Sequence, residues 1–166
     1  MRDIDGLLQK IIPPTDYQHR EGFNNVPIID SLTSEERLEI ECRLIALLAG
    51  KIDYLIIESL VHIKSRKAVS TLEMALFKTQ NPIDTLIIAW AIFAITGDNK
   101  MCDIALEASI AIDNNYSEAI NYKYNLIAMF DYMAKMHDVR IDKIIKKYLI
   151  HKDILLSFNA RRALSQ

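Results

Sequence analysis

The chain has 166 residues, of which 51% are hydrophobic and 25% charged, and its formal net charge at pH 7 is −2. This composition is typical of a globular domain that buries its own core, and it excludes a disordered chain. Only four glycines, four prolines and two cysteines are present. Their scarcity disfavours turn-rich sheets and a disulfide framework. We therefore expect one all-α domain spanning residues 1–166.

Residues 1–32 are predicted to form an N-terminal helix followed by a long loop. Apolar residues on one side of residues 3–12 indicate a short amphipathic helix. Pro13 and Pro14 end this helix, because the residue before a proline is driven out of the helical region. Residues 13–32 are predicted to be irregular, and a loop of that length in a compact domain is often functional.

The next helix is predicted over residues 33–49. The residues from Thr33 to Glu36 match a capping box, in which the first and fourth side chains bond to each other's backbone. The apolar stripe that this helix is expected to bury comprises Leu38, Cys42, Ile45 and Leu48 or Ala49.

Seven further helices are predicted, which gives about nine in all. They cover residues 52–64, 66–79, 81–98, 99–112, 117–135, 139–150 and 153–164. The helix over residues 66–79 is expected to bury Val69, Leu72, Leu76 and Phe77. No segment shows the period-two alternation of a half-buried strand.

The helix over residues 81–98 is predicted to be the centre of the fold. Asn81 and Pro82 are typical of a helix start, and Gly97 is typical of a helix end. Residues 86–95 contain no polar side chain, so all sides of the helix must be covered. The run is too short to span a membrane, which needs about 20 residues. We expect Trp90, the only tryptophan, to be buried there.

Short connections between the predicted helices favour antiparallel hairpins. Such hairpins form either a bundle or a stack, and we expect a hairpin stack over residues 33–166. Asn81, Asn115 and Asp153 are equivalent hairpin starts, separated by 34 and 38 residues. Helical-hairpin repeats recur at roughly 34–47 residues, and stacked repeats form a solenoid.

The segment from Asp153 to Leu164 resembles the first helix of a HEAT repeat, because Ala160, Ala163 and Leu164 fit the end of that pattern. Residues 60–98 resemble a fuller repeat, although the arginine expected after the break is absent. The resemblance covers about residues 51–166 and implies a HEAT-like α-solenoid.

Charge is unevenly distributed along the chain. Residues 1–50 contain nine acidic and five basic residues, a balance of −4, and residues 137–166 contain three acidic and seven basic residues, a balance of +4. This pattern indicates either solvated helix faces or an end suited to a charged partner. Glu35 and Glu36 also have a purely structural interpretation, because acidic residues stabilise the start of a helix. The candidate partner-binding residues are Asp30, Glu35, Glu36, Glu39, Tyr116 and Tyr122.

The sequence contains no phosphate-binding loop, no Cys-x-x-Cys pair and no His-Glu-x-x-His motif. Glu58 and His62 lie four residues apart, a spacing that favours an ordinary side-chain pair over a metal site. We therefore expect no catalytic residues, no cofactor and no bound metal. Nucleic-acid binding is disfavoured, because the net charge is −2 and the basic residues are not interleaved with aromatic ones.

Three segments, residues 25–36, 55–65 and 88–98, are similar to small bacterial HEAT-like proteins, some of which are encoded beside polymorphic or contact-delivered toxins. The resemblance implies a cytoplasmic immunity protein that binds and neutralises a toxin domain. A generic HEAT-repeat adaptor is the first alternative, and a HEAT-like nucleic-acid-binding protein or DNA glycosylase is the second. In the first two cases the partner is another protein. The chain also lacks a recognisable signal peptide or membrane-spanning segment.

Overall fold

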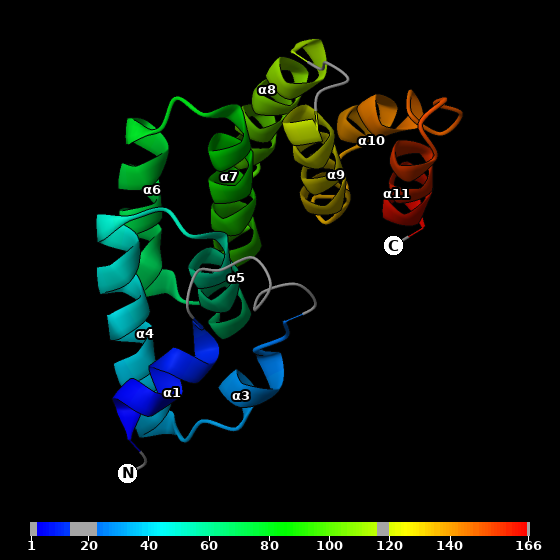
Figure 1. The fold of residues 1–166 in the computed structure, drawn as a ribbon. Coiled ribbons are helices and arrows are strands. Elements are labelled where there is room, and N and C mark those ends of the chain that lie inside the picture. Colours follow the sequence, from blue (N-terminus) through cyan, green and yellow to red (C-terminus); the bar gives the residue numbers. More distant parts are fainter. Residues whose placement is uncertain (1–2, 14–22, 116–119, 166) are drawn as a thin grey trace. The chain divides into compact units, whose positions relative to one another are not determined.

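The computed structural model describes residues 3–13, 23–115 and 120–165. Within these ranges the regular elements are ten α-helices and one short 3-10 helix, and no strand is present (Figure 1). The predicted all-α class is confirmed. The chain divides into two compact units, Met1–Ala75 and Leu76–Gln166, which we call unit 1 and unit 2.

Unit 1 is built mainly from four helices. Helix α4 packs against α5 and α1, and the short helix α3 packs against α5 and α1. The bounds are α1 (Ile4–Ile11), α3 (Val26–Asp30), α4 (Ser34–Gly50) and α5 (Tyr54–Ile63), followed by the 3-10 helix Arg66–Ala68. The boundary between the units falls within α6 (Val69–Lys78).

The prediction of an irregular segment over residues 13–32 is wrong for its second half, because α3 occupies Val26–Asp30. Pro27 indicated a loop, but proline is also well tolerated at the start of a helix, where the missing N–H has no partner to lose. Residues 14–22 of the predicted loop lie outside the described residues.

Asn25, which precedes α3, forms hydrogen bonds with residues of α1 and α5. Its side chain is 6% exposed, and its amide nitrogen donates hydrogen bonds to the Ile11 carbonyl oxygen (3.1 Å) and to Ser59 Oγ (2.8 Å). Ser59 Oγ in turn donates to the Leu55 carbonyl oxygen at 2.6 Å. A buried polar side chain with both amide protons bonded fixes the end of α1 and the start of α3 relative to α5.

The start of α4 confirms the predicted capping box. Glu36 N donates to Thr33 Oγ1 at 3.3 Å, and Thr33 N donates to Glu36 Oε2 at 2.9 Å. Two backbone donors at the helix start are thereby satisfied. Glu36 is buried, with only 2% of its surface exposed.

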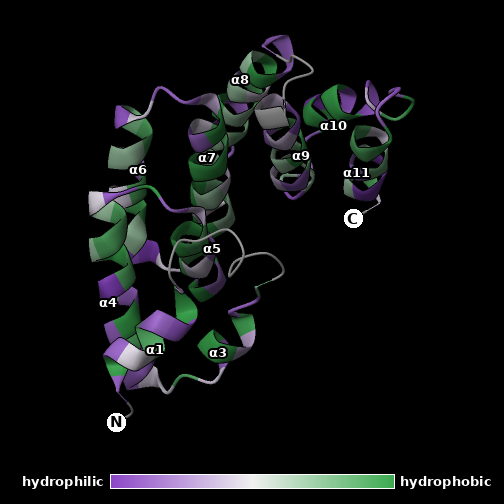
Figure 2. Ribbon diagram, viewed as in Figure 1, coloured by the Kyte–Doolittle hydropathy of each residue, from purple (hydrophilic) through white to green (hydrophobic). Residues whose placement is uncertain are grey.

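The predicted buried stripe of α4 is wrong at Leu38 and Cys42, although Leu48, the last residue of that stripe, is buried. Leu38 is 52% exposed and Cys42 is also exposed, whereas Ile40 and Leu44 are completely buried. The helix carries two apolar stripes, and the one that contacts the rest of unit 1 lies on the other side of the helix. Hydrophobic and hydrophilic positions alternate along α4 in Figure 2. The residues buried on α4 are Glu36, Ile40, Leu44 and Leu48.

Phe77, expected to be buried on α6, is 92% exposed. The buried residue of that helix is Leu72. Five residues advance an α-helix by about 140° beyond one full turn, so Phe77 points away from the side that Leu72 occupies.

Unit 2 contains five helices that follow one another along the chain (Figure 1). Helix α7 packs against α8 and α9, α8 against α9 and α10, and α11 against α9 and α10, while α9 also contacts α10. Their bounds are α7 (Pro82–Thr96), α8 (Lys100–Asn114), α9 (Ile120–Ala134), α10 (Val139–Lys146) and α11 (Ile154–Leu164). Helix α10 ends four residues before its predicted end.

Helix α7 has the ends and the burial that the sequence predicts. Asn81 Oδ1 accepts a hydrogen bond from Ile83 N at 3.1 Å, and Gly97 ends the helix with φ of 76°. Trp90 is 7% exposed, and its ring centroid lies 4.9 Å from that of Tyr132. Hydrophobic residues occupy most of α7 in Figure 2. Within the described ranges, no helix combines the length and the apolar character that a membrane crossing requires.

Candidate functional site

The structure places the predicted partner-binding residues in different units. Asp30 ends α3, and Glu35, Glu36 and Glu39 lie in the first half of α4, all in unit 1. Tyr122 lies on α9 in unit 2. Tyr116 lies outside the described residues. The acidic residues and the tyrosine are therefore treated as separate surfaces.

Three of the four acidic side chains have partners within unit 1, namely Glu36, Asp30 and Glu39. Glu36 is buried in the capping box, so the helix-start interpretation accounts for it. Asp30 Oδ1 lies 2.7 Å from His62 Nε2, which joins the end of α3 to α5. The sequence predicts Glu58 as the neighbour of His62, because the two are four residues apart in one helix. A pair separated by 32 residues, such as Asp30 and His62, cannot be recognised from helical spacing.

Glu39 is half-exposed and is paired with Arg43 on the same helix, whereas Glu35 is exposed. Glu39 Oε1 accepts a hydrogen bond from Arg43 Nε at 2.9 Å, and this bond raises the pKa of the Arg43 guanidinium. Glu35 is exposed and has no ion pair among the described residues. These two carboxylates flank the part of α4 that faces solvent.

The exposed apolar stripe of α4, together with the two carboxylates, forms a surface that we call the outer face of α4. Its apolar members recur every three or four positions, so they lie along one side of the helix. Leu38 is its most exposed large side chain, at 52%. The outer face consists of Leu38, Cys42, Ile45, Ala46 and Ala49, flanked by Glu35 and Glu39.

Glu41 borders this face and is held by the segment that leads into α6. Its carboxylate accepts hydrogen bonds from Ser65 Oγ (2.6 Å) and Lys67 Nζ (3.0 Å). Burial tends to raise the pKa of Glu41, but the two hydrogen bonds and the Lys67 charge outweigh burial, so its pKa lies below the ordinary value. One edge of the outer face is thus fixed by a stable ionic contact.

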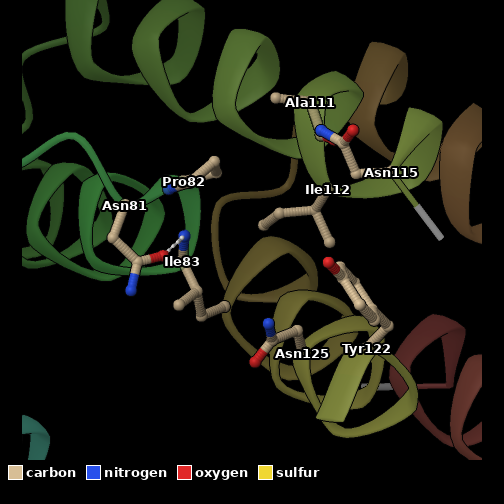
Figure 3. A pocket seen from close by; sticks show the side chains of 8 residues that line it. All are labelled: Asn81, Pro82, Ile83, Ala111, Ile112, Asn115, Tyr122 and Asn125. Atoms are coloured by element: carbon tan, nitrogen blue, oxygen red, sulfur yellow. Dashed lines mark hydrogen bonds between the residues drawn. The ribbon is translucent and has the colours of Figure 1, made fainter. Parts of the chain in front are cut away.

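Unit 2 contains a half-open pocket of about 250 Å³ beside Tyr122. The start of α7, the end of α8 and the first half of α9 line it, and the Tyr122 hydroxyl points toward Ile112 and Ile83 (Figure 3). Its lining residues are Asn81, Pro82, Ile83, Ala111, Ile112, Asn115, Tyr122 and Asn125.

The pocket lining is uncharged and combines amide and phenol groups with apolar side chains. Asn81 is engaged through its oxygen in capping α7, and Asn115 Nδ2 donates to the Ala111 carbonyl oxygen at 2.7 Å. Amide and phenol groups form hydrogen bonds with neutral polar groups but supply neither an activated nucleophile nor an acid–base pair. The lining therefore offers hydrogen bonds and apolar contacts to a bound group.

The tyrosines within α9 divide between the surface and the core of unit 2. Tyr122 and Tyr124 are 45% and 54% exposed, whereas Tyr132 is 8% exposed and packs against Trp90. Tyr132 therefore belongs to the core of unit 2, whereas Tyr122 and Tyr124 belong to its surface.

Four ion pairs that the sequence did not reveal connect the helices of unit 2. Between α8 and α10, Asp103 pairs with Arg140 (2.8 Å) and Asp113 with Lys147 (2.6 Å). Between α9 and α11, Lys123 pairs with Asp153 (2.5 Å) and Asp131 with Arg162 (2.8 Å). All four join residues in alternate helices. In the sequence, such ion pairs appear only as oppositely charged residues separated by about one repeat length.

Comparison of the chain with family models, with curated proteins and with solved structures returned no significant match. Among the described residues, no group of three or more histidine, cysteine, aspartate or glutamate side chains is arranged to hold a metal ion. The expectation that the protein lacks metal and catalysis stays a prediction.

Acidification is expected to destabilise unit 2 through Asp138, which caps α10. Hydrogen bonds from the Arg140 side chain lower the pKa of Asp138, against the effect of burial and with help from backbone N–H groups. Because the pKa of Asp138 is lower in the folded protein than in the unfolded chain, ionised Asp138 stabilises the fold fully at pH values above its unfolded-state pKa of about 3.8. This stabilisation is lost as the pH falls through the folded-state pKa. Asp138→Asn should therefore be less stable than the wild type near neutral pH, and the difference should shrink in acid. Urea unfolding across this pH range measures it, and a difference that does not change with pH would contradict the assignment.

Proposed function

We propose that the chain is a non-catalytic protein-binding module whose docking surface is the outer face of α4. The observation that carries this proposal is an apolar stripe, beginning at Leu38, that remains exposed on a helix whose opposite side buries Ile40 and Leu44. Contiguous apolar surface rimmed by charged residues is typical of protein interaction sites. The flanking carboxylates of Glu35 and Glu39 favour a partner with a basic surface.

The packing of unit 2 supports a repeat architecture for this module. Asp103 and Arg140 lie near the starts of α8 and α10, and Asp113 and Lys147 lie at their ends. Two ion pairs in this register require that the two helices run in the same direction. The partners are 37 and 34 residues apart, and helical-hairpin repeats recur at roughly 34–47 residues.

Helices α9 and α11 show the same relation. Lys123 and Asp153 lie near their starts, and Asp131 and Arg162 lie toward their ends. Alternate helices that run in the same direction and contact each other are the arrangement of stacked helical hairpins. We infer that unit 2 is a short α-solenoid, in keeping with the HEAT-like resemblance of the sequence.

Among protein-binding functions, we favour that of an immunity protein that binds a toxin domain in the cytoplasm. The sequence resemblance suggests this role, and an acidic outer face would suit a basic toxin such as a nuclease. An adaptor would use the same face, but binding would leave its partner active. The two functions are separated by measuring the activity of the partner in the complex.

The experiment reverses the two negative charges of the outer face. We expect the Glu35→Lys, Glu39→Lys double variant to associate with its partner more slowly and with a weaker salt dependence, because opposite charges chiefly raise the association rate. Glu35 also lies in the first turn of α4, so its reversal is expected to cost about 0.3–1 kcal/mol of stability. The first partner to test is a toxin encoded beside this gene, with stopped-flow association as the measurement.

The matched control is Glu73→Lys with Glu107→Lys. These two glutamates are exposed on α6 and α8, outside the outer face, and their reversal changes the net charge by the same amount. The control should retain the association rate of the wild type apart from a small long-range effect. If both double variants slow association equally, net charge and not the outer face is responsible, and the proposed docking surface is wrong.

A further inference from the structure

A second unpartnered apolar surface lies on α11. Ile154, Leu155 and Phe158 are 83%, 43% and 60% exposed. Ile154 and Phe158 are four residues apart, and Leu155 and Phe158 are three apart, so the three side chains share one side of the helix. We call this surface the α11 face.

Ion pairs hold the α11 face in place on unit 2. Asp153 at the start of α11 pairs with Lys123 of α9, and Arg162 near the end of α11 pairs with Asp131 of α9. Tyr124, which follows Lys123 on α9, is 54% exposed. The face is therefore a fixed feature of a packed helix pair.

The α11 face has a basic rim. Arg161 and Arg162 are exposed beside it. The guanidinium of Arg161 donates hydrogen bonds to the Leu149 carbonyl oxygen at 3.0 and 3.2 Å, and that of Arg162 is paired with Asp131, so Arg161 carries the positive charge without an acidic partner in these contacts. The surrounding residues 137–166 have a charge balance of +4, from seven basic and three acidic residues. The α11 face and the outer face of α4 are thus alike in shape, each an apolar stripe on one exposed helix, and opposite in charge.

We propose that the α11 face of one copy of the chain binds the outer face of α4 of a second copy. Apolar side chains of the two helices would pack together in the manner of two surface helices, with Glu35 and Glu39 of one copy near Arg161 and Arg162 of the other. This inference concerns a second occupant of the outer face and does not rest on the proposed function.

Charge decides which pairs of faces can meet. Two α11 faces would bring basic rims together, and two outer faces would bring acidic rims together, whereas the mixed pair brings opposite charges together. The contact is consequently heterologous, with different surfaces on the two copies. Two helix faces bury less than a standard interface, so the association is weak, depends on protein concentration, and weakens as salt is added.

The test uses sedimentation equilibrium over a series of protein concentrations. The wild type is expected to self-associate. Leu38→Gln removes a large exposed apolar side chain from the outer face, and Phe158→Gln removes one from the α11 face. Each substitution should weaken self-association by about tenfold or more, as expected when an apolar interface contact is lost.

An equimolar mixture of the two variants gives the decisive result. One variant retains an intact α11 face and the other an intact outer face, so the mixture should form a dimer of one copy of each, although each variant alone is monomeric. Glu35→Lys with Glu39→Lys, and Ile154→Gln, provide a second variant of each face. Thermal unfolding followed by circular dichroism selects folded variants.

The remaining outcomes overturn the proposal. A wild type that stays monomeric at all concentrations shows that the two faces do not bind each other. Loss of association in Phe158→Gln but not in Leu38→Gln indicates a symmetric contact between two α11 faces, and the reverse result indicates a contact between two outer faces. A mixture of folded variants that remains monomeric also contradicts the heterologous contact.

Discussion

Replacing Leu44 with alanine is expected to lower the free energy of unfolding by about 2–5 kcal/mol, the usual range for a buried leucine. The same replacement at Leu38 is expected to change it by less than about 0.5 kcal/mol, as for most surface substitutions. The two leucines lie on the same helix, but Leu44 is completely buried and Leu38 is 52% exposed. Urea unfolding of both variants measures the difference under identical conditions.

This pair tests the orientation of α4 directly. Because the substitution and the helix are the same, differences in helix propensity and in the removed volume cancel. A loss at Leu38 as large as that at Leu44 would mean that the Leu38 side of the helix is buried in solution. The outer face of α4 would then not exist as a free surface.

Replacing Trp90 with alanine is expected to lower the free energy of unfolding by about 3–5 kcal/mol. The indole is 7% exposed, its ring contacts that of Tyr132, and Lys135 Nζ lies 5.0 Å from its centroid. The substitution leaves a cavity and removes both an aromatic contact and a cation–π contact. Urea unfolding followed by circular dichroism measures the loss, because the variant has no tryptophan fluorescence.

Phe77→Ala is the matched control for the Trp90 substitution. Phe77 is 92% exposed, so its loss should change the free energy of unfolding by less than about 0.5 kcal/mol. In the wild-type protein, the fluorescence of Trp90 should be that of an indole shielded from water. An emission maximum typical of exposed indole, or a small stability loss in Trp90→Ala, would contradict the placement of α7 in the core.

The features that the sequence predicted correctly are mostly local. The capping of α4 by Thr33 and Glu36 and the ends of α7 at Asn81 and Gly97 depend on residues within one turn of each other. Burial of α7 was also predictable, because a helix that is apolar on every side has no polar face to expose. Helix caps and uniformly apolar helices can therefore be recognised from a short stretch of sequence.

The orientation of α4 was not predictable in the same way. Both Leu38 and Leu44 belong to apolar stripes with helical spacing, and only the helices packed against α4 decide which of the two is buried. On α6, likewise, the apolar pattern predicts that Phe77 is buried, but its side chain is exposed. An amphipathic pattern identifies the buried side of a helix only when one side is apolar.

The contacts that define the candidate surfaces are long-range. Asp30 and His62 are 32 residues apart, and Asp131 and Arg162 are 31 apart. Charged residues are common enough that such pairs cannot be selected from the sequence without the fold. The acidic excess of the first 50 residues pointed to unit 1, but only burial separates Glu36, which stabilises the helix start, from Glu35, which remains on the surface.

The most direct test of the protein-binding account is a calorimetric titration of the partner into the wild type, into Leu38→Lys and into Leu155→Lys. Both variants place the same charge at an exposed leucine, the first on the outer face of α4 and the second on α11. We predict that Leu38→Lys weakens binding by about tenfold or more, while Leu155→Lys binds like the wild type. Unchanged affinity in a folded Leu38→Lys variant would contradict the central claim that the outer face of α4 is the docking surface.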